Sequence, residues 1–176
     1  MHPFLLAAAA VLNMATPIAE VDPARDATPH AAFPVDERWA ALVPELLCTD
    51  LDASLAFYRD VVGFRVRFER AEDGFVYLEF GRAQLMLEEV GPESWRTAAL
   101  VRPFGRGINL QIEVDALAPL HRRLSAAGIR LFREPHESRY REGDIEHRQI
   151  ELLVQDPDGY LLRFVEILPD RPFPAR

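Results

Sequence analysis

The chain has 176 residues, a net charge of −8 and one cysteine, Cys48. The acidic balance disfavours nucleic acid as a partner, because phosphates need a basic surface, and it is compatible with a cationic ligand. A single cysteine excludes an intrachain disulfide framework, and its apolar strand context predicts an inert buried thiol. No stretch approaches the roughly 20 apolar residues of a membrane-spanning helix, so we expect no membrane partner.

Residues 1–41 do not read as part of the fold. The apolar run Phe4–Leu12 is similar to a signal-peptide core, but no basic residue other than His2 precedes it. Four prolines between positions 17 and 34 then break any regular element. We interpret this segment as a loose leader or an over-extended start, with a working export signal as the alternative. The expected location is the cytoplasm.

Residues 42–90 predict a first β-α-β-β-β repeat. Asp50 or Asp52 can cap a helix over Ala53–Val62, and Gly63 is suited to end it. Alternating apolar and polar residues predict strands on both sides of that helix. The expected strands are Leu42–Cys48, Phe64–Arg70, Phe75–Phe80 and Ala83–Glu89.

The same layout returns 65 positions later, so that Asp50 corresponds to Asp115 and Gly63 to Gly128. Residues 91–106 form a linker, and residues 107–168 form a second β-α-β-β-β repeat. Its expected elements are strand Ile108–Val114, helix Ala116–Ala127 and strands Ile129–Arg133, Arg148–Gln155 and Tyr160–Ile167. We interpret the polar segment 134–147 as an inserted loop and residues 169–176 as a tail.

Asp156-Pro157-Asp158-Gly159 is a strong turn signal before the last strand of the second repeat. Aligning its glycine with Gly81 pairs the last strands of the two repeats. The predicted fold class is α+β, with two tandem β-α-β-β-β repeats whose curved sheets surround a shared cleft and carry their helices on the outer faces.

The sequences DLDASLAFYRDVVGF and LVQDPDGYLLRFVE, together with the internal repeat, are similar to the vicinal oxygen chelate superfamily. This superfamily includes glyoxalase I, extradiol dioxygenases, fosfomycin resistance enzymes and bleomycin resistance proteins. The resemblance implies metal-ligand positions in the first and last strands of each repeat. These positions hold Pro44, Leu85, Asn109 and Arg163. Pro and Leu offer no donor atom, Asn is a poor ligand and Arg repels a cation, so we expect no metal and no other cofactor.

Without a metal, the closest resemblance is to the bleomycin resistance branch, whose members sequester a cationic glycopeptide antibiotic and catalyse nothing. It implies a homodimer with ligand grooves between the chains, lined by aromatic side chains and carboxylates. Arg65 and Arg67 depart from that branch, which has an acidic residue there, whereas Phe68 is retained beside them. The alternatives are a metal-dependent lyase, isomerase or dioxygenase, and a binder of an unrelated hydrophobic metabolite.

Strand alternation predicts which side chains face the cleft, because successive residues point to opposite faces of a sheet. Phe64, Val66 and Phe68 alternate with Arg65 and Arg67 along the second expected strand. Val76, Leu78 and Phe80 are assigned to the core. The cleft face is then assigned Phe75, Tyr77 and Glu79 from the first repeat and Asn109, Gln111 and Glu113 from the second. A face covered by solvent or by a partner subunit is the alternative.

Trp95 and Phe104 are the large apolar side chains of the linker. They either cover the groove, stacking on a planar ligand, or fill space beneath a loop. Arg163 is expected to face inward, where it would either recognise an anionic group or form an internal ion pair with Glu151 or Glu113. His136 and His147, with ten residues between them in a charged segment, have a weak spacing for a metal site.

Overall fold

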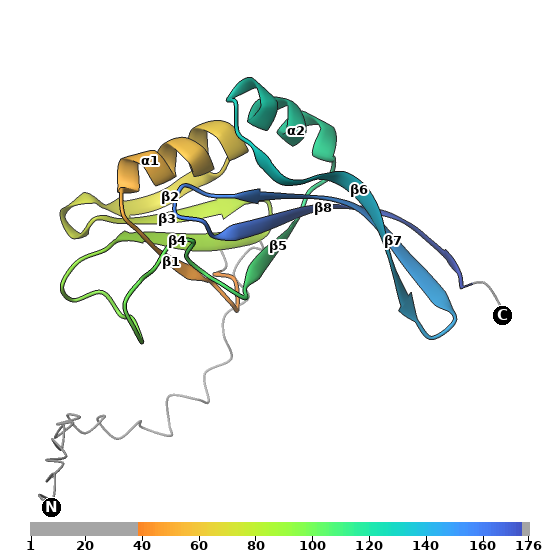
Figure 1. Ribbon diagram of the computed structural model, residues 1–176, viewed down its shortest axis with the longest axis horizontal. Helices are drawn as coiled ribbons and strands as arrows, with labels where there is room; N and C mark the ends of the chain where they lie inside the picture. The colour runs from red at the N-terminus through yellow and green to blue at the C-terminus, as the bar shows by residue number, and fades with distance from the viewer. Residues whose placement is uncertain (1–38, 174–176) are drawn as a thin grey trace, which may run out of the picture. The chain divides into compact units, whose positions relative to one another are not determined.

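Each repeat folds into a four-stranded sheet with one helix, as Figure 1 shows for the computed structural model, which describes residues 39–173. The first sheet has the order β1-β4-β3-β2 and the second the order β5-β8-β7-β6. β1 and β4 are parallel, as are β5 and β8, and the other neighbours are antiparallel. The strands are β1 (Glu45–Cys48), β2 (Arg65–Arg70), β3 (Phe75–Phe80), β4 (Ala83–Glu89), β5 (Asn109–Glu113), β6 (Leu131–Glu142), β7 (Ile145–Gln155) and β8 (Leu161–Pro172). This architecture confirms the predicted α+β class and its tandem repeats.

The first helix begins where the sequence predicts a cap. Asp50 accepts a hydrogen bond from the backbone N–H of Ala53 at 2.9 Å, which satisfies one of the free donors at the start of α1 (Leu51–Leu55). The helix continues as a wider π-helical stretch over Ala56–Val62. It ends at Gly63, whose φ of 99° favours a residue without a side chain.

One apolar core joins the two repeats on the faces of the sheets that the helices cover. Val76 and Leu78 of β3 point into it, and Leu120 and Leu124 of α2 (Leu117–Ala126) do the same. The helices are neighbours in Figure 1, and the Arg123 side chain donates to the backbone carbonyl of Val62 at 2.7 Å. The helices therefore pack against each other as well as against their own sheets.

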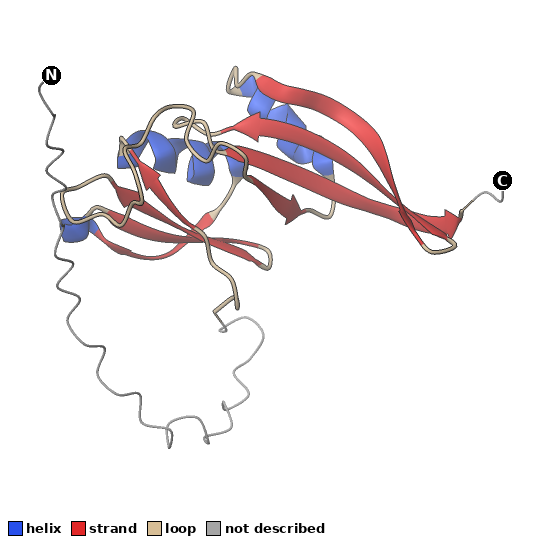
Figure 2. Ribbon diagram, turned by 60° about the horizontal axis from the view of Figure 1, so that its bottom comes forward, coloured by secondary structure: helices blue, strands red, loops and turns tan. Residues whose placement is uncertain are grey.

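Segment 134–147 is a long β-hairpin, so the prediction of an inserted loop was wrong. β6 and β7 pair from Leu131–Val154 out to Glu142–Ile145, and Gly143, with a φ of 58°, lies in the turn. Figure 2 shows the two long strands ending in that turn. The segment is rich in charge because most of its side chains are exposed, and backbone pairing rather than core burial makes it a strand.

β8 continues alongside the hairpin to Pro172, so residues 169–172 of the expected tail belong to the second sheet. Charged contacts fasten this extension. Arg171 binds Glu146 at 2.6 Å, and the His147 ring lies 2.7 Å from Glu142 and 3.0 Å from Asp170. These two carboxylates raise the pKa of His147 by their hydrogen bonds.

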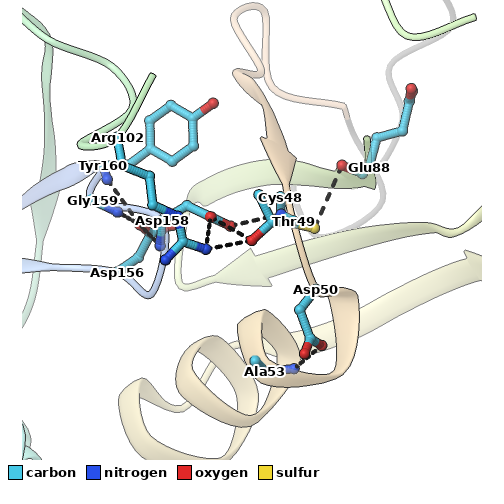
Figure 3. A network of polar contacts seen from close by, with 10 residues as sticks. All are labelled: Cys48, Thr49, Asp50, Ala53, Glu88, Arg102, Asp156, Asp158, Gly159 and Tyr160. Atoms are coloured by element: carbon cyan, nitrogen blue, oxygen red, sulfur yellow. Dashed lines mark hydrogen bonds and ion pairs between the residues drawn. The ribbon is translucent and has the colours of Figure 1, made fainter. Parts of the chain in front are cut away.

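The turn before β8 fastens the linker and the first repeat to the second. Asp158 accepts hydrogen bonds from the backbone N–H of Thr49 at 2.9 Å and from Arg102 at 2.7 Å (Figure 3). Asp156 accepts one from the hydroxyl of Tyr58 at 3.0 Å and three from backbone N–H groups of its own turn. The turn, the linker and the first repeat are therefore joined through the carboxylates of Asp156 and Asp158, which we call the clasp.

Two further expectations concern burial and membranes. Cys48 is buried, as predicted, and burial raises the pKa of its thiol to about 11, which keeps it protonated and unreactive. Within residues 39–173, none of the helices has the length and apolar character needed to cross a membrane. The leader assigned to residues 1–41 lies outside the described residues except for its last three.

Gly159→Ala should destabilise the fold more than Gly143→Ala. Both glycines have positive φ, which costs an L-residue roughly 1–2 kcal/mol. A Cβ at Gly159 would also lie 2.5 Å from the Cβ of Pro103, whereas a Cβ at Gly143 meets nothing within 4 Å. The clash adds about 1–3 kcal/mol. Urea unfolding of both variants measures the difference, and equal losses would contradict the proposed close contact between turn and linker.

Candidate ligand-binding site

The first sheet has one face turned to α1 and an opposite face that none of the helices within residues 39–173 covers. Cross-strand neighbours place acidic side chains on the β1–β4 side of the second face and aromatic side chains on its β3–β2 side. We call it the acid–aromatic face. Two rows of side chains cross it, Glu45–Met86–Tyr77–Phe68 and Leu47–Glu88–Phe75–Arg70.

Four rings form a cluster on this face. Phe68 stacks on Tyr77 with ring centres 5.2 Å apart, and Phe75 lies 5.9 Å from Phe68. Trp39, which precedes β1, places its indole edge-on to Tyr77 at 4.8 Å and to Phe68 at 5.7 Å. Both geometries are among the favoured arrangements of aromatic pairs.

Arginines surround these rings. The guanidinium of Arg67 lies 4.6 Å from the centre of the Trp39 ring, and that of Arg70 lies 3.8 Å from the centre of Phe75. Glu79, which the sequence assigns to the cleft face, is bonded to Arg65 and lies 3.8 Å from Arg67. Arg70 also binds Asp73 at 2.8 Å, so two carboxylates partly balance the three arginines on the aromatic side of the face.

Phe75 and Tyr77 lie on the predicted face but are not open to solvent. Only 2% of the Tyr77 surface is exposed, because Trp39 and Phe68 cover the ring. The Tyr77 hydroxyl donates to Gln84 at 2.6 Å. The expectation of an accessible aromatic floor was therefore wrong in one respect, since neighbouring side chains already cover that floor.

A β-bulge corrects the predicted alternation of β2. Val66 pairs with Leu78, but Phe68 pairs with Tyr77, so Arg67 is an extra residue in the ladder. Without the bulge, Phe68 would follow Val66 onto the face turned to the helix, as the period of two predicts. The bulge instead brings Phe68 beside Tyr77 on the acid–aromatic face.

Two carboxylates lie close together on the acidic side of the face. Partial shielding from water raises the pKa of Glu45, and the charge of Glu88 and a hydrogen bond with it raise it further, against a smaller opposing effect of Arg70. The carboxylates of Glu45 and Glu88 repel each other when both are ionised. A bound cation between them would relieve that repulsion.

An open pocket of about 930 Å³ lies beside these acids, under the linker. Glu45 and Leu47 line it from β1, and Trp95 lines it from the linker with 93% of its surface exposed. Phe104 is buried at its base and packs edge-on against Tyr160 at 5.9 Å. Of the two alternatives for the linker aromatics, Phe104 fills space beneath the loop, whereas Trp95 is free to contact a ligand.

A second cavity, of about 350 Å³, lies where the two sheets approach each other. Pro44, Leu85, Asn109 and Gln111 line it, so the internal repeat correctly brought three of the four metal positions together. Leu85 itself belongs to the apolar core. The neighbouring residue that lines the cavity with a polar group is Gln84.

The side chains around this cavity do not fit a metal ion. Gln84, Asn109 and Gln111 offer neutral amides, Pro44 offers no donor, and Arg163 donates a hydrogen bond to Gln111. Within residues 39–173, no group of three or more His, Cys, Asp or Glu side chains is arranged to hold a metal. His136 and His147 are far apart along the hairpin ladder, where they pair with Glu151 and Tyr140.

Of the two alternatives for Arg163, the structure shows the internal ion pair. Its Nη1 lies 3.6 Å from the carboxylate of Glu151, which is 3% exposed and also accepts a hydrogen bond from Tyr140 at 3.1 Å. Burial by itself raises the pKa of Glu151, but hydrogen bonds from Ser138 and Tyr140 and the charge of Arg163 lower it overall. Glu113, the other candidate partner, lies 3.6 Å from Arg82 instead.

The predicted site residues therefore divide into three groups. Phe68, Phe75, Tyr77 and Glu79 lie on the acid–aromatic face, Trp95 and Phe104 line the linker pocket, and Asn109, Gln111, Glu113 and Arg163 lie on β5 and β8. Gln84 connects the first and third groups. Sequence reasoning missed Trp39, Glu45 and Gln84. Glu45 could have been found from the sequence. It lies between Pro44 and Leu46 in the first strand, and strand alternation places it on the face opposite Leu46.

Comparisons with known proteins place these observations in a family. The model of the Glyoxalase/Bleomycin resistance protein/Dioxygenase superfamily matches residues 43–164. None of the proteins with curated descriptions matches the sequence.

The chain is also similar to several solved structures. A superfamily member from Vibrio splendidus 12B01 is 36% identical, covering 72% of this chain and 97% of that chain, with a TM-score of 0.33. TioX from Micromonospora sp. ML1 is 21% identical, covering 73% and 100%, with a TM-score of 0.56. A bleomycin resistance determinant encoded on transposon Tn5 is 24% identical, covering 73% and 98%, with a TM-score of 0.50. The last two likenesses support the fold alone.

Arg163→Met should destabilise the protein at neutral pH by roughly 1–3 kcal/mol, because it leaves a buried carboxylate short of a partner. The folded-state pKa of Glu151 is lowered, so its contribution is present above the ordinary pKa of glutamate and is lost as the pH falls. The gap between wild type and variant should close in acid. Urea unfolding at several pH values measures it. The double variant Glu151→Gln/Arg163→Met should recover most of the loss, and equal losses in both variants would contradict the pairing.

Proposed function

This chain belongs to the Glyoxalase/Bleomycin resistance protein/Dioxygenase superfamily, and we propose that it acts there as a binding protein. It sequesters a cationic aromatic small molecule of the bleomycin type, and no bond is made or broken. A cell containing it would be protected because the bound molecule cannot reach its target.

The polarity of the acid–aromatic face carries this proposal. Neighbouring strands of a sheet are about 4.8 Å apart, so the row from Glu45 to Tyr77 separates acid and ring by roughly 10 Å. A ligand with a cationic end and an aromatic end can therefore lie across the strands. Its charge would meet Glu45 and Glu88, and its rings would meet Phe68 and Tyr77.

The linker pocket supplies the room for a large ligand. Its volume of about 930 Å³ is near the upper end of ordinary small-molecule sites, and Glu45 lies both in this pocket and on the acid–aromatic face. The exposed indole of Trp95 offers a stacking surface at the pocket wall. The net charge of −8 attracts a cation over longer distances.

The donor set supports binding without catalysis. The superfamily positions considered above present an amide, a guanidinium, a proline and a leucine, and these groups cannot hold a Lewis-acidic ion. The buried Glu151 carboxylate is already engaged by Arg163 and Tyr140 rather than free to move a proton.

We also propose that the chain forms a homodimer. Phe132, Tyr140 and Ile145 are exposed on the β6–β7 hairpin, and Ile167 is exposed on the neighbouring β8. β6 is an edge strand of its sheet, with a row of backbone groups available for pairing. A second copy would cover these surfaces and bring its own residues next to the ligand groove.

Metal-free bleomycin should bind with measurable heat in isothermal titration at hundred-micromolar concentration. Glu45→Gln should weaken binding by roughly tenfold, because one charge contact in a partly shielded site is worth about 1.4 kcal/mol. The pKa of Glu45 is raised, so affinity should fall on acidification at a higher pH than for an ordinary glutamate.

Glu72→Gln, in the exposed turn before β3, is the matched control and should bind like wild type. Mass spectrometry should recover the ligand unchanged after incubation. Absence of heat for wild type, or a modified ligand, would overturn the proposal, as would stoichiometric metal in elemental analysis of gently purified protein.

Light scattering at micromolar concentration should give a mass of twice the 20.0 kDa of one chain. Ile145→Asp should shift the mass towards the monomer, because a charge would be buried in the apolar contact. A monomeric wild type would contradict the proposed homodimer and its shared groove. Binding of the ligand by a single chain would still be tested by the titration.

A further inference from the structure

The indole of Trp39 occupies the position that the ring of a ligand would take on the acid–aromatic face. It touches Tyr77 and Phe68 edge-on, and the guanidinium of Arg67 lies 4.6 Å above it. The backbone N–H of the next residue, Ala40, donates to Gln84 at 2.7 Å. A ring held between a cation and two aromatic neighbours, with an N–H donor beside it, is the arrangement expected of a bound aromatic ligand as well as of a packed side chain.

Trp39 is only loosely attached to the sheet on which its ring lies. The side chain leaves 59% of its surface in solvent, and residues 39 and 40 belong to no strand or helix. The rings beneath it are positioned independently, because Phe68 and Tyr77 are a cross-strand pair of β2 and β3. Removal of the indole would therefore expose a preformed aromatic surface rather than dismantle one.

We propose that Trp39 is a built-in occupant of a ring-binding site, and that a planar, electron-rich aromatic group binds there by displacing it. Electron-rich rings are favoured because their faces attract the guanidinium of Arg67. An N–H donor next to the ring would take the place of the Ala40 N–H on Gln84.

The charges around the site narrow the ligand class further. Arg65, Arg67 and Arg70 lie on this side of the face, and Glu79 is engaged by two of them. Because Arg70 also binds Asp73, a small excess of positive charge remains, and it favours a neutral or anionic ring over a cationic one. A cationic group on the same molecule would lie at the other end, near Glu45 and Glu88. The inference rests on the proposed function only in taking this face as the binding face.

Trp39 also lowers the apparent affinity of the ring-binding site for its ligand. A ligand that must displace Trp39 binds more weakly by the fraction of time for which the site is open. The segment that carries Trp39 thus discriminates between ligands, because only one that also gains energy elsewhere on the face can replace the indole efficiently.

The test uses N-acetyl-tryptophan methylamide, which carries an indole and the N–H that follows it. Ligand-observed NMR should show that Trp39→Ala binds this probe at least about fivefold more tightly than wild type, because the competing occupant is gone. Ile108→Ala removes a 62% exposed apolar side chain that lies outside the first sheet and should bind like wild type. Trp39→Ala/Phe68→Ala lacks part of the ring floor and should lose the gain. No gain in Trp39→Ala, or a gain that persists in the double variant, would overturn the inference.

A second measurement does not depend on the stability of these variants. In Trp95→Phe, Trp39 is the only tryptophan, and its indole N–H gives a single resonance in isotope-labelled protein. Saturating unlabelled probe should move this resonance towards the position of solvent-exposed tryptophan, and an unmoved resonance would count against displacement. If bleomycin fails to bind but the probe gives the expected results, the ring-binding site stands and the proposed function falls.

Discussion

Two carboxylates in one turn hold this fold together. Asp158 fixes the end of β1 through Thr49 and the linker through Arg102, while Asp156 organises the turn and reaches Tyr58 in the first helix. Burial raises the pKa of Asp156, against the effect of the hydrogen bonds it accepts, which indicates how fully it is removed from water. Because buried polar groups are stable only when satisfied, the turn, the linker and the start of the first helix must form together.

The clasp also positions the candidate binding surfaces. It holds the end of β1, and β1 carries Glu45 and Leu47, which connect the acid–aromatic face with the linker pocket. It also holds the linker, which carries Trp95 into that pocket. Binding residues from distant parts of the sequence therefore share one support, although none of the clasp residues on the turn needs to touch a ligand.

Local patterns in the sequence predicted the repeat and the succession of strands and helix along the chain. They also gave Asp50 as one of two candidate helix caps and an internal ion pair as one of two alternatives for Arg163. Each of these depends on spacing along the chain or on the shortage of partners for a buried charge. The errors have a different origin. The bulge at Arg67 reverses the direction of Phe68, and the charged hairpin 134–147 is held by backbone pairing, which leaves little trace in side-chain composition. Trp39 was assigned to the leader because its contacts with Tyr77 exist only after the sheet has formed. Whether the ten predicted site residues bind a ligand stays a prediction.

The clasp has no equivalent in the first repeat, although the two repeats share their layout. Where the second repeat has Asp156 and Asp158 before Gly159, the first has Leu78 and Phe80 before Gly81, and both of these side chains pack in the apolar core. The halves are therefore alike in backbone but complementary in chemistry. Two copies of the first half could not reproduce the joint that one copy of each half makes, because neither copy would supply the two aspartates that accept from Thr49, Arg102 and Tyr58.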